Sequence, residues 1–398
     1  MTNEEYIEEH YSDDVRKLAL SHIPDGVDAL WCLQQIEGRQ LAKKKLPLWA
    51  QTKGLWFPPR LAMEQCSSEA TALYKRRIAE RLLPDAEERT TCVDFTGGYG
   101  VDFSFLASLF ENATYVEKQP ELCRIAEHNF TTLGIDNAEV VCADCMSSAQ
   151  FGHNKISLAY LDPARRDDAK RKMVALEDCS PNLMEMQDTL LQRASLIMVK
   201  LSPMLDISMA LHKLRSVIEI HVVSLRGECK ELLFVLSKNK ATPTIHCVNL
   251  ETIDPDVICP IGESFKQQAK LPDKIGDYLY EPNASILKAA VQDKVASNYN
   301  LLKLHGDSHL YTSNEFRNDF PGRSFKVIDS CSFGKHDLHR ILSDIKQANI
   351  TVRNFPATAE ELRNRLKLKD GGNIFLFATT LVDERHVLIK CVKANENS

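Results

Sequence analysis

Asp94-Phe95-Thr96-Gly97-Gly98-Tyr99-Gly100-Val101-Asp102 follows an apolar run and precedes a segment with helical periodicity. Glycines let a backbone turn sharply and approach a ligand closely at the carboxyl end of a strand, where open α/β sheets bind their cofactors. The stretch therefore predicts a strand, a ligand-binding loop and a helix, although a glycine turn also occurs where a strand is simply joined to a helix. We expect the cofactor to contact Asp94, Thr96, Gly97, Gly98 and Gly100.

Acidic residues end the next two predicted strands. Glu117 lies seventeen positions beyond Gly100, where an acidic side chain can accept both hydrogen bonds from the ribose diol of a nucleotide cofactor. Phe103 stands in place of the third glycine of the dinucleotide fingerprint, which argues against a dinucleotide such as NAD. Asp144 follows the third strand and is a candidate either to accept the adenine amino group or to cap a helix.

The fourth predicted strand leads into Tyr160-Leu161-Asp162-Pro163-Ala164-Arg165-Arg166, beside the expected position of the reacting group. Together with residues 94–100, Glu117 and Asp144, in that order, this string resembles motifs I to IV of class I methyltransferases that use S-adenosylmethionine (SAM). The resemblance covers residues 91–238. It implies an α/β fold with a Rossmann-like seven-stranded sheet, SAM as the cofactor, and Asp162, Pro163 and Arg165 as catalytic residues.

Two narrower resemblances bear on the substrate. The string Asp162-Pro163-Ala164-Arg165 is similar to motif IV of RNA 5-methyluridine methyltransferases, which need a cysteine after the fifth strand, but residues 200–204 contain none. Amino-group methyltransferases carry Asp or Asn, Pro, Pro and an aromatic residue; the first two positions match here and the last two depart. The Arg165 guanidinium could stack on a base or hold a phosphate. We therefore favour methylation of a base amino group, held by Asp162 and the Pro163 carbonyl, in a scheme that requires no metal.

The complete layout resembles a bacterial methyltransferase family with a small ferredoxin-like unit and a C-terminal THUMP-like domain. The segments that carry this resemblance are Glu64-Gln65-Cys66-Ser67-Ser68-Glu69, Asp162-Pro163-Ala164-Arg165-Arg166, Lys200-Leu201-Ser202-Pro203 and Ser324 to Val392. THUMP domains bind RNA, so the resemblance implies a transfer or ribosomal RNA substrate. Gln65 and Ser67 are candidates to line the methionine end of SAM or to cap the following helix.

Changes in hydrophobic pattern along the chain predict four regions. Residues 1–88 form a helical region with an aromatic-rich loop at 46–60, and Leu73 lies on the predicted buried face of the helix over residues 69–83. Residues 89–238 form the SAM-binding domain, with five strands and helical crossovers followed by an antiparallel pair. Residues 239–322 comprise a linker and a ferredoxin-like unit, and residues 323–398 a THUMP-like domain. Within the last two regions, residues 275–320 and 324–395 are predicted to form two small α+β units.

Composition bounds the location and the partners of the protein. The 398 residues are 44% hydrophobic and 26% charged, with twelve cysteines interpreted as reduced thiols and no apolar stretch long enough for a membrane span. We expect a cytoplasmic protein with no membrane partner. Cys142-x-x-Cys145 lacks a second pair, so we expect no metal. Although the net charge is −6, residues 317–369 contain 11 Lys or Arg against 6 Asp or Glu, a local excess of +5.

These observations favour a SAM-dependent methyltransferase that acts on RNA. Two other classes of function stay open at this point. One is a non-catalytic RNA-binding module that retains a SAM pocket, and the other is a nucleotide-dependent enzyme of another class. Binding of SAM rather than NAD, and transfer of its methyl group to RNA, would distinguish the three.

Overall fold

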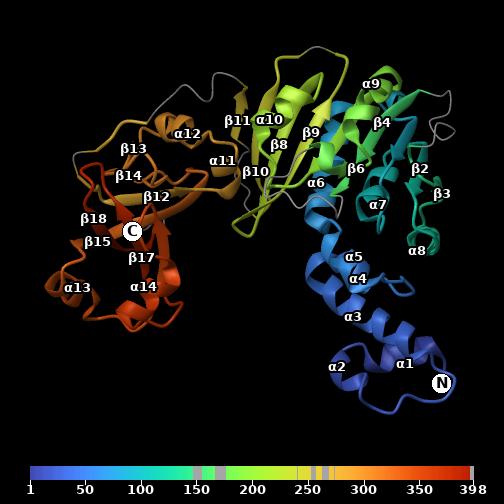
Figure 1. Ribbon diagram of the computed structural model, residues 1–398, viewed down its shortest axis with the longest axis horizontal. Coiled ribbons are helices and arrows are strands. Elements are labelled where there is room, and N and C mark those ends of the chain that lie inside the picture. Colours follow the sequence, from blue (N-terminus) through green and yellow to red (C-terminus); the bar gives the residue numbers. More distant parts are fainter. Residues whose placement is uncertain are drawn as a thin grey trace. The chain divides into compact units, whose positions relative to one another are not determined.

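The computed structural model describes residues 1–146, 155–165, 176–239, 241–251, 257–261, 269–272 and 274–394. The chain forms two compact units, one of Met1–Ile218 with Leu232–Ala241 and the other of Glu219–Glu231 with Thr242–Ser398. Figure 1 follows the chain from the N-terminal helices in blue to the C-terminal sheet in red. All twelve cysteines are free thiols, as predicted. Within the described ranges, no helix combines the length and the apolar character that crossing a bilayer requires.

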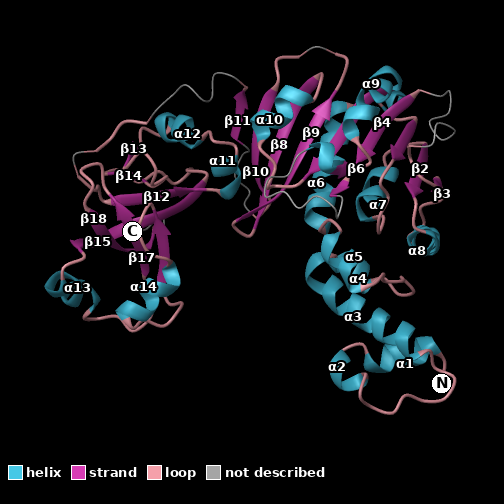
Figure 2. Ribbon diagram, viewed as in Figure 1, coloured by secondary structure: helices cyan, strands magenta, loops and turns pink. Residues whose placement is uncertain are grey.

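The region before the first strand is helical, as expected (Figure 2). Its elements are α1 (Asn3–His10), α2 (Val15–Leu18), α3 (Ala29–Lys45), α4 (Pro47–Gln51), α5 (Arg60–Gln65), α6 (Glu69–Leu82) and the 3-10 helix η1 (Ala86–Glu88). The expected loop at 46–60 instead begins with helix α4, because Pro47 occupies the first helical turn, where its missing N–H is not needed. Trp49 packs edge-on against Tyr99, with ring centroids 5.0 Å apart, and so joins the helices to the glycine loop.

The main sheet has the strand order β11-β10-β8-β9-β7-β4-β1-β2-β3. Strands β1, β2, β3, β4 and β7 are parallel, as the sequence predicted, and β9 runs antiparallel to β7. The order β3-β2-β1-β4-β7-β9-β8 is the expected seven-stranded arrangement, and β10 and β11 extend it beyond β8. The elements are β1 (Thr91–Asp94), α7 (Val101–Ala107), β2 (Asn112–Glu117), α8 (Pro120–Thr132), β3 (Ala138–Cys142), β4 (Ile156–Leu161), β5 (Ala164–Arg165), η3 (Leu176–Asp178), β6 (Cys179–Ser180), α9 (Leu183–Arg193), β7 (Ala194–Leu201), α10 (Ile207–Lys213), β8 (Val217–Leu225), β9 (Glu228–Leu236), β10 (Thr244–Asn249) and β11 (Val257–Pro260).

The C-terminal elements form one sheet of order β13-β14-β12-β15-β18-β17-β16. The strands of the two predicted α+β units share this one sheet, because the long strand β15 pairs with β12 on one side and β18 on the other. The elements are β12 (Tyr278–Pro282), α11 (Ala284–Lys288), α12 (Gln292–Asn298), β13 (Leu302–Lys303), β14 (Tyr311–Ser313), β15 (Gly322–Ser332), α13 (Lys335–Leu342), β16 (Asn349–Arg353), α14 (Ala359–Leu366), β17 (Phe375–Thr380) and β18 (His386–Lys393).

Alternation along β17 divides this unit into two apolar layers. Leu376 and Ala378 belong to one buried cluster with Ile341 and Leu362, whereas Phe377 belongs to another with Phe325. Successive side chains of a strand point to opposite faces of the sheet. The sheet is therefore buried on both faces, which explains why strand-like apolar runs dominate this part of the sequence.

Candidate active site at the carboxyl edge of the main sheet

Asp94 ends β1 and is almost fully buried, with 2% of its surface exposed. Its carboxylate oxygen Oδ1 accepts hydrogen bonds from the backbone N–H of Thr96 at 2.9 Å and from the Thr96 hydroxyl at 3.2 Å. Burial raises the pKa of Asp94 to about 8, and the neighbouring charges of Asp102 and Asp162 act in the same direction, although the Thr96 N–H opposes them. Asp94 is therefore mostly protonated at neutral pH.

The glycine loop that follows β1 packs tightly against aromatic side chains. A Cβ atom at Gly97 would overlap the ring of Tyr115, and a Cβ at Gly100 would lie 2.8 Å from the ring of Phe130. Gly100 also has a φ of +80°, which side chains rarely allow. The Tyr115 hydroxyl donates to the carbonyl of Gly98. Gly97 and Gly100, two of the three predicted glycines, are therefore required by packing against Tyr115 and Phe130.

Glu117 ends β2 beside this loop and is 8% exposed. Its Oε2 atom accepts the backbone N–H of Gly98 at 2.9 Å, and its Oε1 atom accepts the N–H of Gln119 at 2.9 Å. Each carboxylate oxygen has a second lone pair that can accept another hydrogen bond. The arrangement therefore orients Glu117 and keeps it able to bind a diol.

Asp162 follows the central strand β4 and is linked to two neighbouring strands. Its backbone N–H donates to the Thr96 hydroxyl at 2.6 Å, and the Lys200 ammonium donates to its Oδ2 atom at 2.5 Å. Lys200 lies in β7, which is parallel to β4. The structure thus brings together Asp94, Thr96 and Asp162, as the motif order predicted, and adds Lys200. Lys200 lies at the end of the fifth predicted strand, in the segment Lys200-Leu201-Ser202-Pro203. This position at a strand end is the signal that could have identified it as a site residue.

The remaining predicted site residues lie around this edge. Asp144 is exposed after β3, and its carboxylate accepts the backbone N–H of Met146 at 2.9 Å. Pro163 is buried, and the backbone of Arg165 pairs with Cys179 in the short β5–β6 ladder. Gln65 is exposed at the end of α5. Arg166, the last residue of the quoted motif, lies outside the described residues.

A buried polar cluster surrounds Asp102, which lies in α7 directly after the glycine loop. Asp102 of α7 receives hydrogen bonds at its Oδ2 atom from Ser67 at 2.6 Å and from Tyr160 at 2.7 Å, and the Lys75 ammonium lies 3.0 Å from its Oδ1 atom. Burial alone would raise the pKa of Asp102, but the charges of Lys75 and Lys200 and the two hydroxyl donors hold it below its ordinary value. Asp102 is therefore ionised although it is 7% exposed.

The contacts of Asp102 bear on two predictions about α6: which serine caps the helix, and which side chains are buried. Ser68, rather than Ser67, caps the helix by accepting the N–H of Thr71 at 3.3 Å, which leaves the Ser67 hydroxyl for Asp102. Leu73, predicted to be buried, is 37% exposed, whereas Lys75 is fully buried. Lys75 was missed because a lysine is rarely buried unless it is paired, and its partner lies in another helix.

A second polar group borders this edge near α5. The Lys45 ammonium donates to the backbone carbonyls of Met63 at 2.9 Å and Glu64 at 2.7 Å. Burial lowers the pKa of Lys45, and the charge of Lys200 lowers it further, whereas Cys66 and Glu64 oppose the shift. The pKa of the Cys66 thiol is raised mainly by burial. The Lys45 and Lys200 ammonium groups are therefore close enough for their charges to interact.

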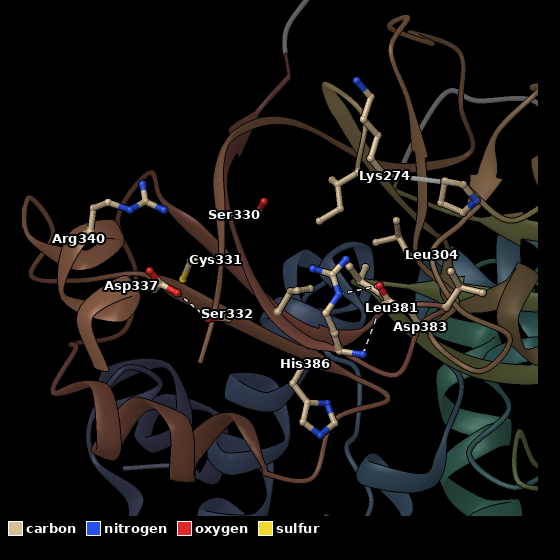
Figure 3. Close-up of a pocket in the computed structure, with 15 residues that line it drawn as sticks. Lys274, Leu304, Ser330, Cys331, Ser332, Asp337, Arg340, Leu381, Asp383 and His386 are labelled. Carbon is tan, nitrogen blue, oxygen red and sulfur yellow. Dashed lines mark hydrogen bonds and ion pairs between the residues drawn. The ribbon is translucent and has the colours of Figure 1, made fainter. Parts of the chain in front are cut away.

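The C-terminal unit has a separate cavity of about 620 Å³ (Figure 3). Arg385 donates to Asp383 at 2.6 Å, and Asp337 accepts a hydrogen bond from Ser332 at 2.6 Å. Arg340 pairs with Asp329. The guanidinium groups of Arg340 and Arg385 at this cavity are therefore already paired with carboxylates.

Comparison with known proteins identifies the family. Models of a ferredoxin-like domain and of a THUMP-like domain match residues 278–321 and 322–393. The crystal structure of a "putative methyltransferase" from Porphyromonas gingivalis W83 is 34% identical, covers 99% of this chain and 98% of its own, and has a TM-score of 0.86. The chain belongs to the methyltransferase family with a C-terminal THUMP-like domain. The family and fold class expected from the motif order are thereby confirmed.

Other solved structures are similar to part of this methyltransferase family member. An rRNA methylase from Streptococcus thermophilus is 18% identical, covering 41% of this chain and 96% of its own, with a TM-score of 0.31. Another "putative methyltransferase", from Streptococcus mutans and solved with S-adenosylhomocysteine (SAH), is 12% identical, covering 40% of this chain and 94% of its own, with a TM-score of 0.30. These partial likenesses carry no argument about activity. No curated protein matches the sequence significantly.

Proposed function

We propose that the protein transfers the methyl group of SAM to a base amino group of transfer or ribosomal RNA. The observation that carries this proposal is the convergence of two arrangements at one sheet edge. Glu117 holds the glycine loop through the Gly98 N–H, and Lys200 holds Asp162, whose N–H is bound by Thr96. A diol-binding carboxylate and a second, oriented carboxylate are what cofactor binding and substrate alignment each need.

The cofactor would occupy the space above the glycine loop. The unused lone pairs of Glu117 would accept the two ribose hydroxyls, and the exposed Asp144 would accept the adenine amino group. Gln65 would line the methionine end. Ser67 would act indirectly, because its hydroxyl donates to Asp102. When bound, SAM supplies a methyl group activated by a sulfonium leaving group.

Asp162 and the carbonyl of Pro163 would align the acceptor nitrogen. Lys200 binds the Oδ2 atom of Asp162 and so directs Oδ1 toward the amino group of a flipped-out base. Alignment of two reactants can contribute about 7 to 11 kcal/mol to catalysis, so orientation is the main contribution required of these side chains. Lys200 is thus a positioning residue, and Arg165 would stack on the base or hold a phosphate.

Exposed basic residues in the THUMP-like domain support an RNA substrate. Of the eleven basic residues between 317 and 369, five form ion pairs with nearby carboxylates. The other six are exposed and form no ion pair among the described residues: Lys326, Lys335, Lys346, Arg365, Lys367 and Lys369. Lys335 and Arg365 border one hollow of about 550 Å³, and the Lys369 N–H donates to the Lys346 carbonyl. Grouped exposed cations are suited to phosphate contacts.

The proposal is tested by incubating the protein with labelled SAM and RNA from cells that lack it, followed by nucleoside analysis. Asp162→Ala should lower turnover by roughly 10²-fold or more, in the range seen when one transition-state hydrogen bond is lost, while SAH affinity stays unchanged by calorimetry. Glu117→Ala should instead weaken SAH binding roughly 10- to 100-fold. Asp188→Ala, which removes an exposed carboxylate paired with Arg215, is the control.

Each result distinguishes the alternatives. Wild-type protein that binds SAH and RNA without transferring methyl would be a non-catalytic module and would refute the enzymatic proposal. Failure to bind SAH, with binding of another nucleotide, would indicate a different enzyme class. Wild-type turnover by Asp162→Ala would remove Asp162 from the catalytic assignment.

A further inference from the structure

Two histidines and a glutamate face one another on neighbouring strands of the second unit. Strand β10 runs parallel to β8, and the register places Thr244 beside Glu219 and His246 beside His221 (Figure 1). Residues two apart on a strand point to the same face, so these four side chains share one face of the sheet. The site residues are therefore brought together by strand pairing rather than by a sequence motif.

The atoms that could bind a metal lie close together. Glu219 Oε2 is 3.0 Å from His221 Nε2, and Glu219 Oε1 is 3.9 Å from His246 Nε2. One ligand atom from each of the three residues lies within 4.8 Å of the others. In a tetrahedral zinc site with bonds of 2.0 to 2.1 Å, ligand atoms are separated by about 3.3 Å. The two measured separations lie on either side of this value, so small side-chain rotations would complete the geometry.

The surroundings favour a tightly held ion. The side chains of His221, His246 and Glu219 are 1%, 9% and 13% exposed. The next residues on the same face, Val223 and Val248, are buried and apolar. These apolar side chains lower the local dielectric constant, which strengthens the attraction between a cation and a carboxylate. The rigid strands also hold the ligands in place without loop ordering.

We propose that Glu219, His221 and His246 bind a zinc ion that joins β8 to β10. Imidazole nitrogens and a carboxylate oxygen are ligands of zinc, whereas calcium and magnesium prefer oxygen ligands throughout. Three protein ligands leave a fourth position for water. The Thr244 hydroxyl is hydrogen-bonded to His246 Nε2 at 2.9 Å, and zinc binding by this nitrogen would replace that bond and leave the hydroxyl to bind the water. The ion would link the additional strand β10 to β8 through side chains as well as through the backbone. The inference is independent of the proposed methyl transfer.

The test uses the full-length protein, stripped with a chelator and then loaded with zinc alone. After gel filtration, elemental analysis should find a single zinc ion per chain, and zinc should raise the midpoint of thermal unfolding. Glu219→Gln, which keeps the size of the side chain and an acceptor oxygen, and His246→Gln should each weaken zinc binding by more than the roughly 10- to 100-fold that loss of an outer-shell partner causes. His336→Gln, at a histidine whose side chain is 96% exposed, is the matched control.

Cobalt substitution distinguishes metal bound by Glu219, His221 and His246 from metal bound by any of the twelve cysteines. Cobalt bound by nitrogen and oxygen gives visible ligand-field bands without the intense thiolate-to-metal charge-transfer absorption that cysteine ligands produce. Circular dichroism verifies that each variant is folded. The proposal would be overturned if Glu219→Gln and His246→Gln bound zinc as tightly as the wild-type protein, if a thiolate absorption band appeared, or if the folded wild-type protein bound no zinc. The cluster would then be a hydrogen-bonded network.

Discussion

Replacing Lys75 with methionine should destabilise the first unit by leaving the Asp102 carboxylate buried without its cation. Methionine is similar in length to lysine and keeps the apolar packing of α6 against α7. The Lys75 ammonium lies 3.0 Å from Asp102 Oδ1, and Lys75 has no exposed surface. Breaking a buried ion pair by removing one partner costs about 3 to 5 kcal/mol. Because Ser67 and Tyr160 still donate to Asp102, we expect the free energy of unfolding to fall by about 3 kcal/mol, at the low end of that range.

The loss should depend on pH with a definite sign. In the wild-type protein the pKa of Asp102 is below its ordinary value, so its contribution to stability is present above the unfolded pKa and is lost as the pH falls through the folded pKa. Without Lys75, burial should raise the pKa of Asp102 above its unfolded value, so the variant should lose stability as the pH rises. The difference between the two proteins should therefore grow from acidic to neutral pH.

Tryptophan fluorescence during urea unfolding measures this loss in the correct unit. The three tryptophans, Trp31, Trp49 and Trp56, all lie in that unit, in the N-terminal region before β1. The double variant Lys75→Met/Asp102→Asn should recover most of the lost stability, because it removes the charge as well as its partner.

The control for this experiment is Arg215→Met. It breaks a pair with Asp188 whose side chains are 68% and 59% exposed, and should cost only about 0 to 1 kcal/mol. A Lys75→Met loss no larger than that of the control, or a loss of equal size at pH 5 and pH 8, would refute a buried and ionised Asp102.

Three further predictions follow from the same unit and from the THUMP-like domain. Because the pKa of Asp94 is raised to about 8, its contribution to stability is fully present only below its unfolded pKa and is lost as the pH rises toward 8; this component should fall by about 1.4 kcal/mol per pH unit between roughly pH 5 and pH 7, and Asp94→Asn should lack it in urea unfolding. Gly97→Ala should cost about 1 to 3 kcal/mol by overpacking the Tyr115 ring and should weaken SAH binding by calorimetry, whereas Gly306→Ala, in open space, should do neither. Lys346→Gln with Lys369→Gln should weaken RNA binding and reduce its salt dependence, because fewer counterions are released; unchanged filter-binding curves at several salt concentrations would exclude these lysines as phosphate contacts.

Local pattern alone identified the strand, glycine loop and helix around Asp94, because periodicity and glycine preference act over a few residues. The succession of strands along the chain and the positions of Glu117 and Asp162 at strand ends followed from the same kind of pattern. Parallel strands have their carboxyl ends at one edge, so the sequence also predicted that these residues would lie near each other. The strand-like runs from Phe325 to Val392 were likewise predicted and are present.

Other features depended on contacts between residues far apart in the chain. The pairs Lys75–Asp102 and Lys200–Asp162 each join separate elements, and the pairing of β15 with β12 joins the two expected units in one sheet. Residues 244–249, expected within a linker, became strand β10 beside β8 and placed His246 next to His221. Such contacts are decided by strand register and helix packing. In a strand, a shift of one residue turns a side chain to the opposite face of the sheet. No local pattern specifies that register, because it is set by the free energy of packing the whole sheet.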